Sequence, residues 1–343
     1  MFVRAAVYYN NRDIRVEERP VPLIGAGELL VRIEASGICG SDVMEWYRIK
    51  KAPIILGHEI SGTITEVGAG VARFKKGMRV TVAHHVPCNT CRYCLEGNHS
   101  VCDMLRTTNF DPGGFCEFVR VPAVNVDRGT FLLPDSMSFE DATFIEPLGC
   151  VIRAFRMARF TPGTDVLVIG SGMSGLLHIK LARALGAGKI AATDINDFRL
   201  KAAKSAGADA VFRGDKVDVP VSVKEALGRM PGLVILCASS DPAISQALKS
   251  VDRGGTIILF APKEPGGTYP FPLFDLWRDN ITIINSYASP PLDTQMALDL
   301  IAAGRVEVND MITHRLGLGE AAEGFRLASE AGDSIKVIIE PQR

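Results

Sequence analysis

The stretch Asp165-Val-Leu-Val-Ile-Gly-Ser-Gly-Met-Ser-Gly175 indicates the fold of this chain more clearly than any other. Its first half has the apolar pattern of a buried strand, and its glycines stand at the spacing Gly-x-Gly-x-x-Gly before a helix predicted from about Ser174 to Leu185. A second apolar strand, Ile190–Asp194, ends in an acid 19 residues after Gly175. The glycine spacing alone is weak evidence, but in this setting it is the dinucleotide-binding fingerprint.

The fingerprint predicts how a dinucleotide is bound. Gly172 lets the backbone approach the pyrophosphate, which rests on the helix N-terminus. Asp194 would accept hydrogen bonds from the adenosine ribose and repel a 2′-phosphate, so NAD is favoured over NADP. The predicted cofactor-binding residues of this motif are Gly170, Gly172, Met173, Ser174, Gly175 and Asp194.

The periodicity on the two sides of this motif differs. After it, strands and helices alternate, which predicts an α/β doubly wound parallel sheet from the segments Leu233–Cys237, Pro242–Val251, Thr256–Ala261 and Ile281–Asn285. Before it, residues 1 to about 135 contain short β-type runs separated by Gly and Pro, which predicts a β-rich domain. The segment after about Tyr287 is too small for a core of its own, so we expect it to pack onto another domain.

The composition is that of an ordinary globular protein, and 343 residues favour two domains. A formal net charge of -1 gives no indication of nucleic-acid or membrane-surface binding. No uncharged apolar stretch reaches the roughly 18 residues that a membrane-spanning helix needs. Met1–Asn10 lacks the features of a signal peptide, so we expect a cytoplasmic protein.

A cluster of candidate ligands lies between Gly37 and Glu59. Gly37-Ile-Cys39-Gly-Ser41-Asp42 and Gly57-His58-Glu59 bring a thiol, a hydroxyl, an imidazole and carboxylates onto turns between strand-like runs. Cys and His suit zinc, and three protein ligands leave a position for a substrate oxygen. The cluster therefore predicts a catalytic metal site.

Four of the eight cysteines form a second cluster, Cys88-x2-Cys91-x2-Cys94-x7-Cys102. Four thiolates in 15 residues match a closed tetrahedral zinc site of the structural kind. An iron–sulfur cluster is the alternative, but ferredoxin spacing places the fourth Cys after three residues and a Pro after it. Here the gap is seven residues and Asp103 follows, so structural zinc is favoured.

A helix is predicted to begin at Ser138, because Ser138-Phe-Glu-Asp141 resembles a capping box. Glu146-Pro147 is predicted to end it, since Pro restricts the residue before it. A carboxylate at a helix C-terminus lies at the unfavourable end of the helix dipole. This placement suggests that Glu146 faces a cation.

A zinc site before a dinucleotide-binding unit, with a four-cysteine segment between, resembles the zinc-dependent medium-chain alcohol dehydrogenases. Cys39-Gly-Ser41-Asp42, Gly57-His58-Glu59 and Glu146-Pro147-Leu148 are most similar to the polyol, threonine and butanediol dehydrogenase branch. The resemblance implies a GroES-like catalytic domain over 1–148, with a structural-zinc lobe at 84–106. It further implies a Rossmann NAD domain over 149–287, a C-terminal return to the catalytic domain over 288–343, and an active site in the cleft between the domains.

The resemblance also implies roles for single residues. Cys39 and His58 would bind the catalytic zinc, Glu59 would be a direct ligand or lie close to it, and Glu146 would stand in the place of the third protein ligand. His58 and Glu59 can both bind only if the backbone turns there, because neighbours on a strand point to opposite faces. The remaining implied roles are Asp42 orienting His58, Ser41 taking the alcohol's proton, and Arg199 lying along the adenosine.

Four residues are candidates for the substrate pocket, although each could equally be a core residue: Trp46, Asn109, Phe110 and Tyr287. We expect Cys116, Cys150 and Cys237 to be buried free thiols and His178 to lie on a packed helix face. His84 and His85 are expected to flank the cysteine segment rather than to bind metal.

The predicted function is reversible oxidation of a secondary alcohol, diol or polyol to a ketone by hydride transfer to NAD, with two zinc ions per chain. Two departures from the family pattern bear on the substrate. Met44 stands near where many relatives have a His that passes the proton to solvent, which weakens a threonine 3-dehydrogenase-like alternative. Ser286 precedes Tyr287 where sorbitol dehydrogenases have an Arg, which argues against sorbitol.

Two further alternatives concern the class of protein. A zinc-free reductase of the same fold is disfavoured by Cys39, His58, Glu146 and Asp194. A nucleotide-sensing or structural member of the fold is the non-enzyme alternative. The expected partners are a small alcohol or ketone and further copies of the chain in a dimer or tetramer, with Ile281–Asn285 as a pairing edge.

Overall fold

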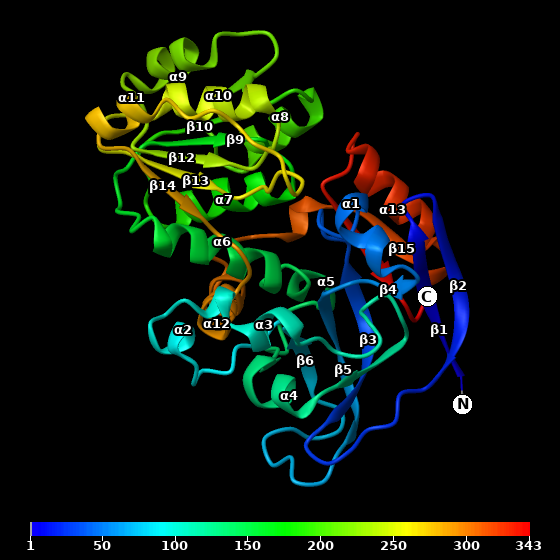
Figure 1. The fold of residues 1–343 in the computed structure, drawn as a ribbon. Coiled ribbons are helices and arrows are strands. Elements are labelled where there is room, and N and C mark those ends of the chain that lie inside the picture. Colours follow the sequence, from blue (N-terminus) through cyan, green and yellow to red (C-terminus); the bar gives the residue numbers. More distant parts are fainter. Residues whose placement is uncertain (1) are drawn as a thin grey trace. The chain divides into compact units, whose positions relative to one another are not determined.

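The computed structural model describes residues 2–343. By their internal contacts they form two compact units, 2–149 with 288–343, and 150–287 (Figure 1). Within residues 2–343, no helix has the length and the apolar character needed to cross a membrane.

The first unit is built on β-sheets. A three-stranded sheet has the order β2-β1-β4, and a seven-stranded sheet has the order β15-β16-β3-β5-β6-β8, with β7 paired to β3. The strands are β1 (Phe2–Asn10), β2 (Asp13–Pro20), β3 (Leu29–Gly37), β4 (Ile54–Ile55), β5 (Glu59–Val67), β6 (Arg79–Val82), β7 (Phe118–Val121), β8 (Thr130–Leu132), β15 (Ile312–Gly317) and β16 (Lys336–Glu340). The helices are short except near the C-terminus: α1 (Glu45–Arg48), η1 (Ile49–Lys51), α2 (Arg92–Leu95), η2 (His99–Val101), α3 (Asp103–Thr107), α4 (Ala123–Gly129), α5 (Phe139–Ala142), α12 (Pro291–Ala302), η3 (Asn309–Met311), η4 (Leu318–Glu320) and α13 (Ala321–Glu330).

The register of three strands in this unit determines where the ligand cluster lies. β3 and β5 pair antiparallel with Gly37 opposite Glu59, so the end of β3 lies beside the start of β5. β16 pairs antiparallel with β3 on its other side, with Ile338 opposite Gly37. Residues near 39, 58 and 336 therefore meet at one end of the sheet, and alternating residues of β3 and β5 (Leu29, Val31, Ile33, Ile60 and Ile64) are buried in its core.

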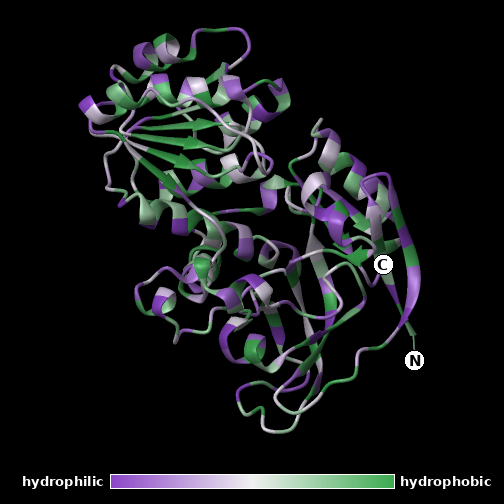
Figure 2. Ribbon diagram, viewed as in Figure 1, coloured by the Kyte–Doolittle hydropathy of each residue, from purple (hydrophilic) through white to green (hydrophobic). Residues whose placement is uncertain are grey.

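The second unit confirms the predicted doubly wound parallel sheet. Its six strands pair in parallel in the order β11-β10-β9-β12-β13-β14. They are β9 (Val166–Ile169), β10 (Ile190–Asp194), β11 (Ala210–Arg213), β12 (Leu233–Leu236), β13 (Thr256–Leu259) and β14 (Thr282–Asn285), and the helices are α7 (Met173–Ala184), α8 (Asp197–Ser205), α9 (Val219–Leu227), α10 (Asp241–Ser250) and α11 (Leu273–Arg278). Helices cover both faces of the sheet, and its strands are almost uniformly hydrophobic (Figure 2), as burial on two faces requires.

The helix near residue 146 differs from the prediction. The expected start is confirmed, because the Ser138 hydroxyl accepts a hydrogen bond from the Asp141 amide at 2.9 Å and α5 follows. The predicted end at Glu146-Pro147 is wrong, because α6 (Ile145–Met157) begins there and Glu146 lies in its first turn. Pro is tolerated in a first turn, where its missing N–H has no helical partner, and a carboxylate there is at the favourable end of the dipole. The position of Glu146 in the helix therefore gives no reason to expect a cation beside it.

Candidate active site and metal centre

Cys39, His58 and Glu59 form one ligand group in the first unit. Each offers one ligand atom, and these atoms all lie within 4.8 Å of one another. Cys39 follows β3, whereas His58 precedes β5 and Glu59 begins it, so the strand register brings them together. Gly57 has φ +92, a left-handed conformation that turns the backbone immediately before His58. The backbone turn that two adjacent ligands require is thus present.

Asp42 holds His58 in place for metal binding. Its Oδ1 lies 3.3 Å from His58 Nδ1, and its Oδ2 accepts a hydrogen bond from the Cys39 amide at 3.1 Å. Burial lowers the pKa of His58, but Asp42 and Cys39 outweigh this and raise it well above the usual value. With Nδ1 engaged by Asp42, Nε2 is the nitrogen of His58 that would bind a metal, the arrangement expected when a carboxylate orients a metal-binding imidazole.

Glu59 makes a buried ion pair that the sequence did not predict. Its Oε2 pairs with Lys336 Nζ on β16, and both side chains have no solvent-exposed surface. Its Oε1 is buried and has no hydrogen-bond partner among the described residues. An unpartnered buried carboxylate oxygen is costly, and a cation beside Cys39 and His58 would satisfy it. The donor set of this group therefore fits zinc.

The fourth predicted ligand, Glu146, is not a member of this ligand group. It lies in the first turn of α6. Its role as a zinc ligand stays a prediction, supported by the family resemblance rather than by the helix-end argument.

Sequence reasoning missed the neighbours of the ligand group. Lys336 is a fully buried Lys in an apolar strand, which signals an ion-pair partner but does not say which carboxylate it is. Arg48 donates from Nη2 to Ser41 Oγ at 2.9 Å and lies in α1, with no distinguishing sequence signal. The ring of His84 lies 4.7 Å from that of His58, so His84 contacts a ligand although it is not in the ligand group itself.

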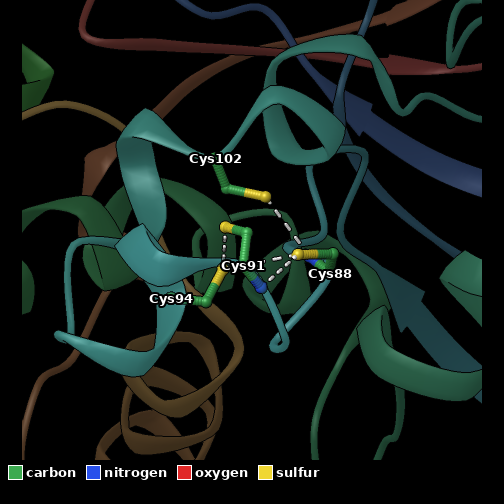
Figure 3. Close-up of side chains that lie close together, drawn as sticks. All are labelled: Cys88, Cys91, Cys94 and Cys102. Atoms are coloured by element: carbon green, nitrogen blue, oxygen red, sulfur yellow. Dashed lines mark hydrogen bonds between the residues drawn. The ribbon is translucent and has the colours of Figure 1, made fainter.

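The predicted structural-zinc cysteines converge. All four thiols, of Cys88, Cys91, Cys94 and Cys102, lie within 4.8 Å of one another (Figure 3). The sulfur of Cys94 is 3.9 Å from that of Cys88 and 3.6 Å from that of Cys91. Four ligands at about 2.3 Å from a central zinc lie about 3.8 Å apart in a tetrahedron, so the spacing fits.

Backbone N–H groups surround these sulfurs, as a thiolate site requires. The amides of Thr90 and Cys91 donate to Cys88 Sγ at 3.4 and 3.2 Å and lower the pKa of this thiol to about 5. The Cys88 amide donates to Cys102 Sγ at 3.4 Å. These N–H groups stabilise negative sulfur at Cys88 and Cys102, the form that binds metal, whereas burial raises the pKa of Cys94 to about 12.

The dinucleotide motif adopts the geometry that its glycines predict. α7 begins at Met173 with Gly172 at its N-cap, and Gly170 has φ +92. A Cβ on Gly175 would overlap the carbonyl oxygen of Gly170, so only glycine lets the helix lie this close to the strand. The motif therefore leaves the helix N-terminus open to a pyrophosphate.

Asp194 and Arg199 both lie beside the motif. The Asp194 carboxylate accepts hydrogen bonds from the amides of Ser171 at 2.7 Å, Ile195 at 2.8 Å and Asn196 at 2.9 Å. A Cβ built on Gly172 would lie 3.7 Å from Arg199 Nη1, and Arg199 Nε is buried without a hydrogen-bond partner among the described residues. An unpartnered donor at this place suits an acceptor on a bound nucleotide.

The four substrate candidates have different environments. Phe110 is 2% exposed and belongs to the core of the first unit, in agreement with the alternative that it is a core residue. The Trp46 ring lies 5.7 Å from that of Tyr47, Asn109 is exposed with its Oδ1 accepting the Phe110 amide at 3.0 Å, and Tyr287 is 49% exposed. Contact of these residues with a substrate stays a prediction.

The other singled-out residues also have defined positions. Cys116 is buried, as expected, whereas the expectation of burial is wrong for Cys150 and Cys237, which are partly exposed. His178 lies on the packed face of α7, also as expected. Burial lowers its pKa to about 4.

Fold, ligand group and dinucleotide motif together define a zinc-binding dehydrogenase. Residues 25–131 match the alcohol dehydrogenase GroES-like domain, and residues 175–303 match the zinc-binding dehydrogenase domain. The chain is 32% identical to a sorbitol dehydrogenase of Gallus gallus over 98% of its own length and 95% of the relative's. It is also 32% identical to a sorbitol dehydrogenase of Bacillus subtilis, covering 99% of this chain and 98% of the relative.

A crystal structure of 2R,3R-butanediol dehydrogenase from Bacillus subtilis superposes with a TM-score of 0.85 at 25% identity, covering 99% of both chains. The protein belongs to the zinc-containing medium-chain alcohol dehydrogenase family, and its relatives include the polyol dehydrogenases of that family. It is an oxidoreductase, and both predicted parts of the fold, the GroES-like domain and the Rossmann-type domain, are confirmed.

Proposed function

We propose that this enzyme oxidises a secondary alcohol, diol or polyol to a ketone, reversibly, with NAD as hydride acceptor and zinc at Cys39, His58 and Glu59. The observation that carries the proposal is the ligand group itself. A thiol, an imidazole and a carboxylate lie within 4.8 Å of one another in a chain whose relatives are polyol dehydrogenases. The relatives include sorbitol and butanediol dehydrogenases, and Ser286 before Tyr287 continues to argue against sorbitol itself.

Each side chain of the site has a separate task in this proposal. Cys39 and His58 would hold the metal, Glu59 would contribute its unpartnered Oε1, and Glu146 would serve as a further ligand. Asp42 keeps His58 in the orientation that presents Nε2. The Ser41 hydroxyl receives the proton of the substrate alcohol and releases its own hydrogen to solvent water in the same step, so that it stays neutral. Zinc supplies Lewis acidity, which lowers the pKa of a coordinated hydroxyl and makes an alcohol a better hydride donor near neutral pH.

We further propose two zinc ions per chain, the second held by the four cysteines. The sulfur spacing and the N–H donors support zinc there. Reduced thiolates of this kind suit a reducing compartment, so we propose the cytoplasm as the location.

A substrate screen tests the proposed function. Purified protein with its metal content measured is assayed with NAD against secondary alcohols, vicinal diols, linear polyols and threonine, and NADH formation is followed by absorbance. Turnover of diols or polyols supports the proposal. Turnover of threonine alone would favour the amino-alcohol alternative, and no turnover of any class would favour a nucleotide-sensing protein.

Asp194→Ala is expected to weaken the preference for NAD over NADP. Asp194 holds Ser171, Ile195 and Asn196 through its carboxylate, and its charge opposes a 2′-phosphate. Removing the charge should change the ratio of kcat/KM for the two cofactors by about tenfold or more in favour of NADP. Tenfold corresponds to about 1.4 kcal/mol. Asp197→Ala, three residues along on an exposed position of α8, is the control. An unchanged NAD/NADP ratio in Asp194→Ala would reject the assigned role.

We propose that the protein forms a homo-oligomer through the edge of the parallel sheet. β14 is the last strand in the sheet order, so one side of it is unpaired within the sheet. The preceding helix, α11, exposes Leu273 at 75%, Phe274 at 64% and Trp277 at 77%. Light scattering on the wild type and on Trp277→Lys tests the proposal, since a monomeric wild type excludes it.

A further inference from the structure

We infer that Arg48 is a positioning residue for the proposed alcohol oxidation, and that it fixes the Ser41 hydroxyl in the orientation in which it meets the substrate. The inference rests on the proposed function, because it concerns the residue proposed to receive the proton. Arg48 itself touches Ser41 and Asp42 rather than the ligand atoms of the metal group.

Arg48 contacts Ser41 at two atoms. Arg48 Nε donates to the Ser41 carbonyl oxygen at 2.9 Å, and Arg48 Nη2 donates to Ser41 Oγ at 2.9 Å. The planar guanidinium thus binds the backbone and the side chain of the same residue at once. Since both oxygens are held by one rigid group, rotation of Ser41 about χ1 would break a charge-assisted hydrogen bond.

The contact with Arg48 leaves the O–H hydrogen of Ser41 available for another partner. A hydroxyl has one donor hydrogen and two acceptor lone pairs, and a guanidinium can only donate. Arg48 therefore occupies one acceptor position of Oγ and cannot receive its hydrogen. One lone pair and the O–H of Ser41 remain for other partners, which include the substrate oxygen.

Arg48 also links Ser41 to Asp42, the residue that orients His58. Its Nη2 lies 3.4 Å from Asp42 Oδ1, the oxygen that lies 3.3 Å from His58 Nδ1. Asp42 is fully buried and the Arg48 side chain is 14% exposed, so little solvent screens the interaction. One side chain thus sets the hydroxyl in relation to the metal ligand.

Local structure holds Arg48 in this position. Its amide donates to the Met44 carbonyl oxygen at 3.1 Å, which closes a helical turn and brings the chain back over Ser41. Its guanidinium carbon lies 4.7 Å from the centroid of the Tyr47 ring, a cation–π contact. Arg48 does not replace the proton-carrying His that many relatives have near position 44, because a guanidinium only donates hydrogen bonds. Its role is to orient Ser41.

The test compares Arg48→Ala, Arg48→Lys and Lys50→Ala in zinc-loaded enzyme, with the best alcohol of the screen and saturating NAD. We expect Arg48→Ala to lower kcat about 100-fold with little change in KM, because a misplaced reacting group costs about this factor. Arg48→Lys should recover part of kcat, since one ammonium cannot bind both oxygens. Lys50→Ala, which removes a nearby exposed charge on η1, should behave as the wild type.

Added guanidinium separates positioning from structural damage. At concentrations below those that denature the protein, it should partly restore kcat of Arg48→Ala and leave the wild type unchanged. Wild-type kcat in Arg48→Ala, or loss of the catalytic zinc from this variant, or failure of guanidinium to restore any activity in a variant that keeps both zinc ions, would overturn the inference. An inactive wild type would instead overturn the proposed function, so the two failures are distinguishable.

Discussion

Cys39→Ala is expected to abolish NAD-dependent alcohol oxidation while the protein still folds. Cys39 supplies the only thiol of the ligand group within residues 2–343, so we expect the proposed catalytic zinc to be lost with it. Zinc lowers the pKa of bound water from 15.7 to about 7, which at about 1.36 kcal/mol per unit is on the order of 12 kcal/mol. Even a quarter of this amount corresponds to more than 100-fold in rate, so we expect activity below detection.

Zinc analysis makes this prediction specific. Cys39→Ala should hold one zinc per chain where the wild type is proposed to hold two, because Cys88, Cys91, Cys94 and Cys102 form a separate group. Cys116→Ala is the matched control, since Cys116 is a buried free thiol in the core of the first unit. It should keep both zinc ions and its activity. Wild-type activity in Cys39→Ala would show that the catalytic role is wrong.

Cys94→Ala is expected to unfold the segment around the four cysteines. Cys94 is 5% exposed, and apart from the cysteines its cluster contains only Leu105 and Ala288, so apolar packing there is slight. A structural zinc contributes about 10–16 kcal/mol in isolated modules, which is comparable to the roughly 5–15 kcal/mol of a whole domain. We therefore expect a large fall in melting temperature and rapid proteolysis within residues 84–106.

The control for this variant is again Cys116→Ala, which removes a buried thiol without removing a metal ligand. Thermal unfolding, limited proteolysis and zinc content are measured on both proteins. An unchanged melting temperature and proteolysis pattern in Cys94→Ala would contradict a structural role. Iron instead of zinc in the wild type would support the iron–sulfur alternative.

Parts of the fold could be predicted because their signals are local. The apolar run Val166–Ile169, the glycines that follow it and the acid at Asp194 all lie within one strand–helix–strand unit. The steric reason for glycine at Gly175 is its contact with the Gly170 carbonyl oxygen, only five positions earlier in the chain, and the left-handed φ of +92 at Gly170 is itself a local feature. Such contacts form almost regardless of the rest of the molecule, so the motif alone indicates the parallel sheet.

The error at Glu146 shows where a local rule is ambiguous. Pro147 disfavours a helical residue before it, but it is also compatible with the first turn of a new helix. The sequence around residue 146 is compatible with a helix end and with a helix start. The structure has a helix start there, with α5 ending at Ala142 and α6 beginning at Ile145. At a helix start the helix dipole favours the Glu146 carboxylate, whereas at a helix end it would disfavour it.

By itself, the sequence indicated the family and the dinucleotide motif and predicted candidate metal ligands, because each is a short pattern of residue types. Only the tertiary structure decided what surrounds the ligands. Glu59 and Lys336 are 277 residues apart and meet because β16 and β5 both pair with β3. Gly37 on β3 lies between them, where a Cβ would overlap both side chains. Partners joined through sheet register leave no local pattern, so chain spacing could not reveal them.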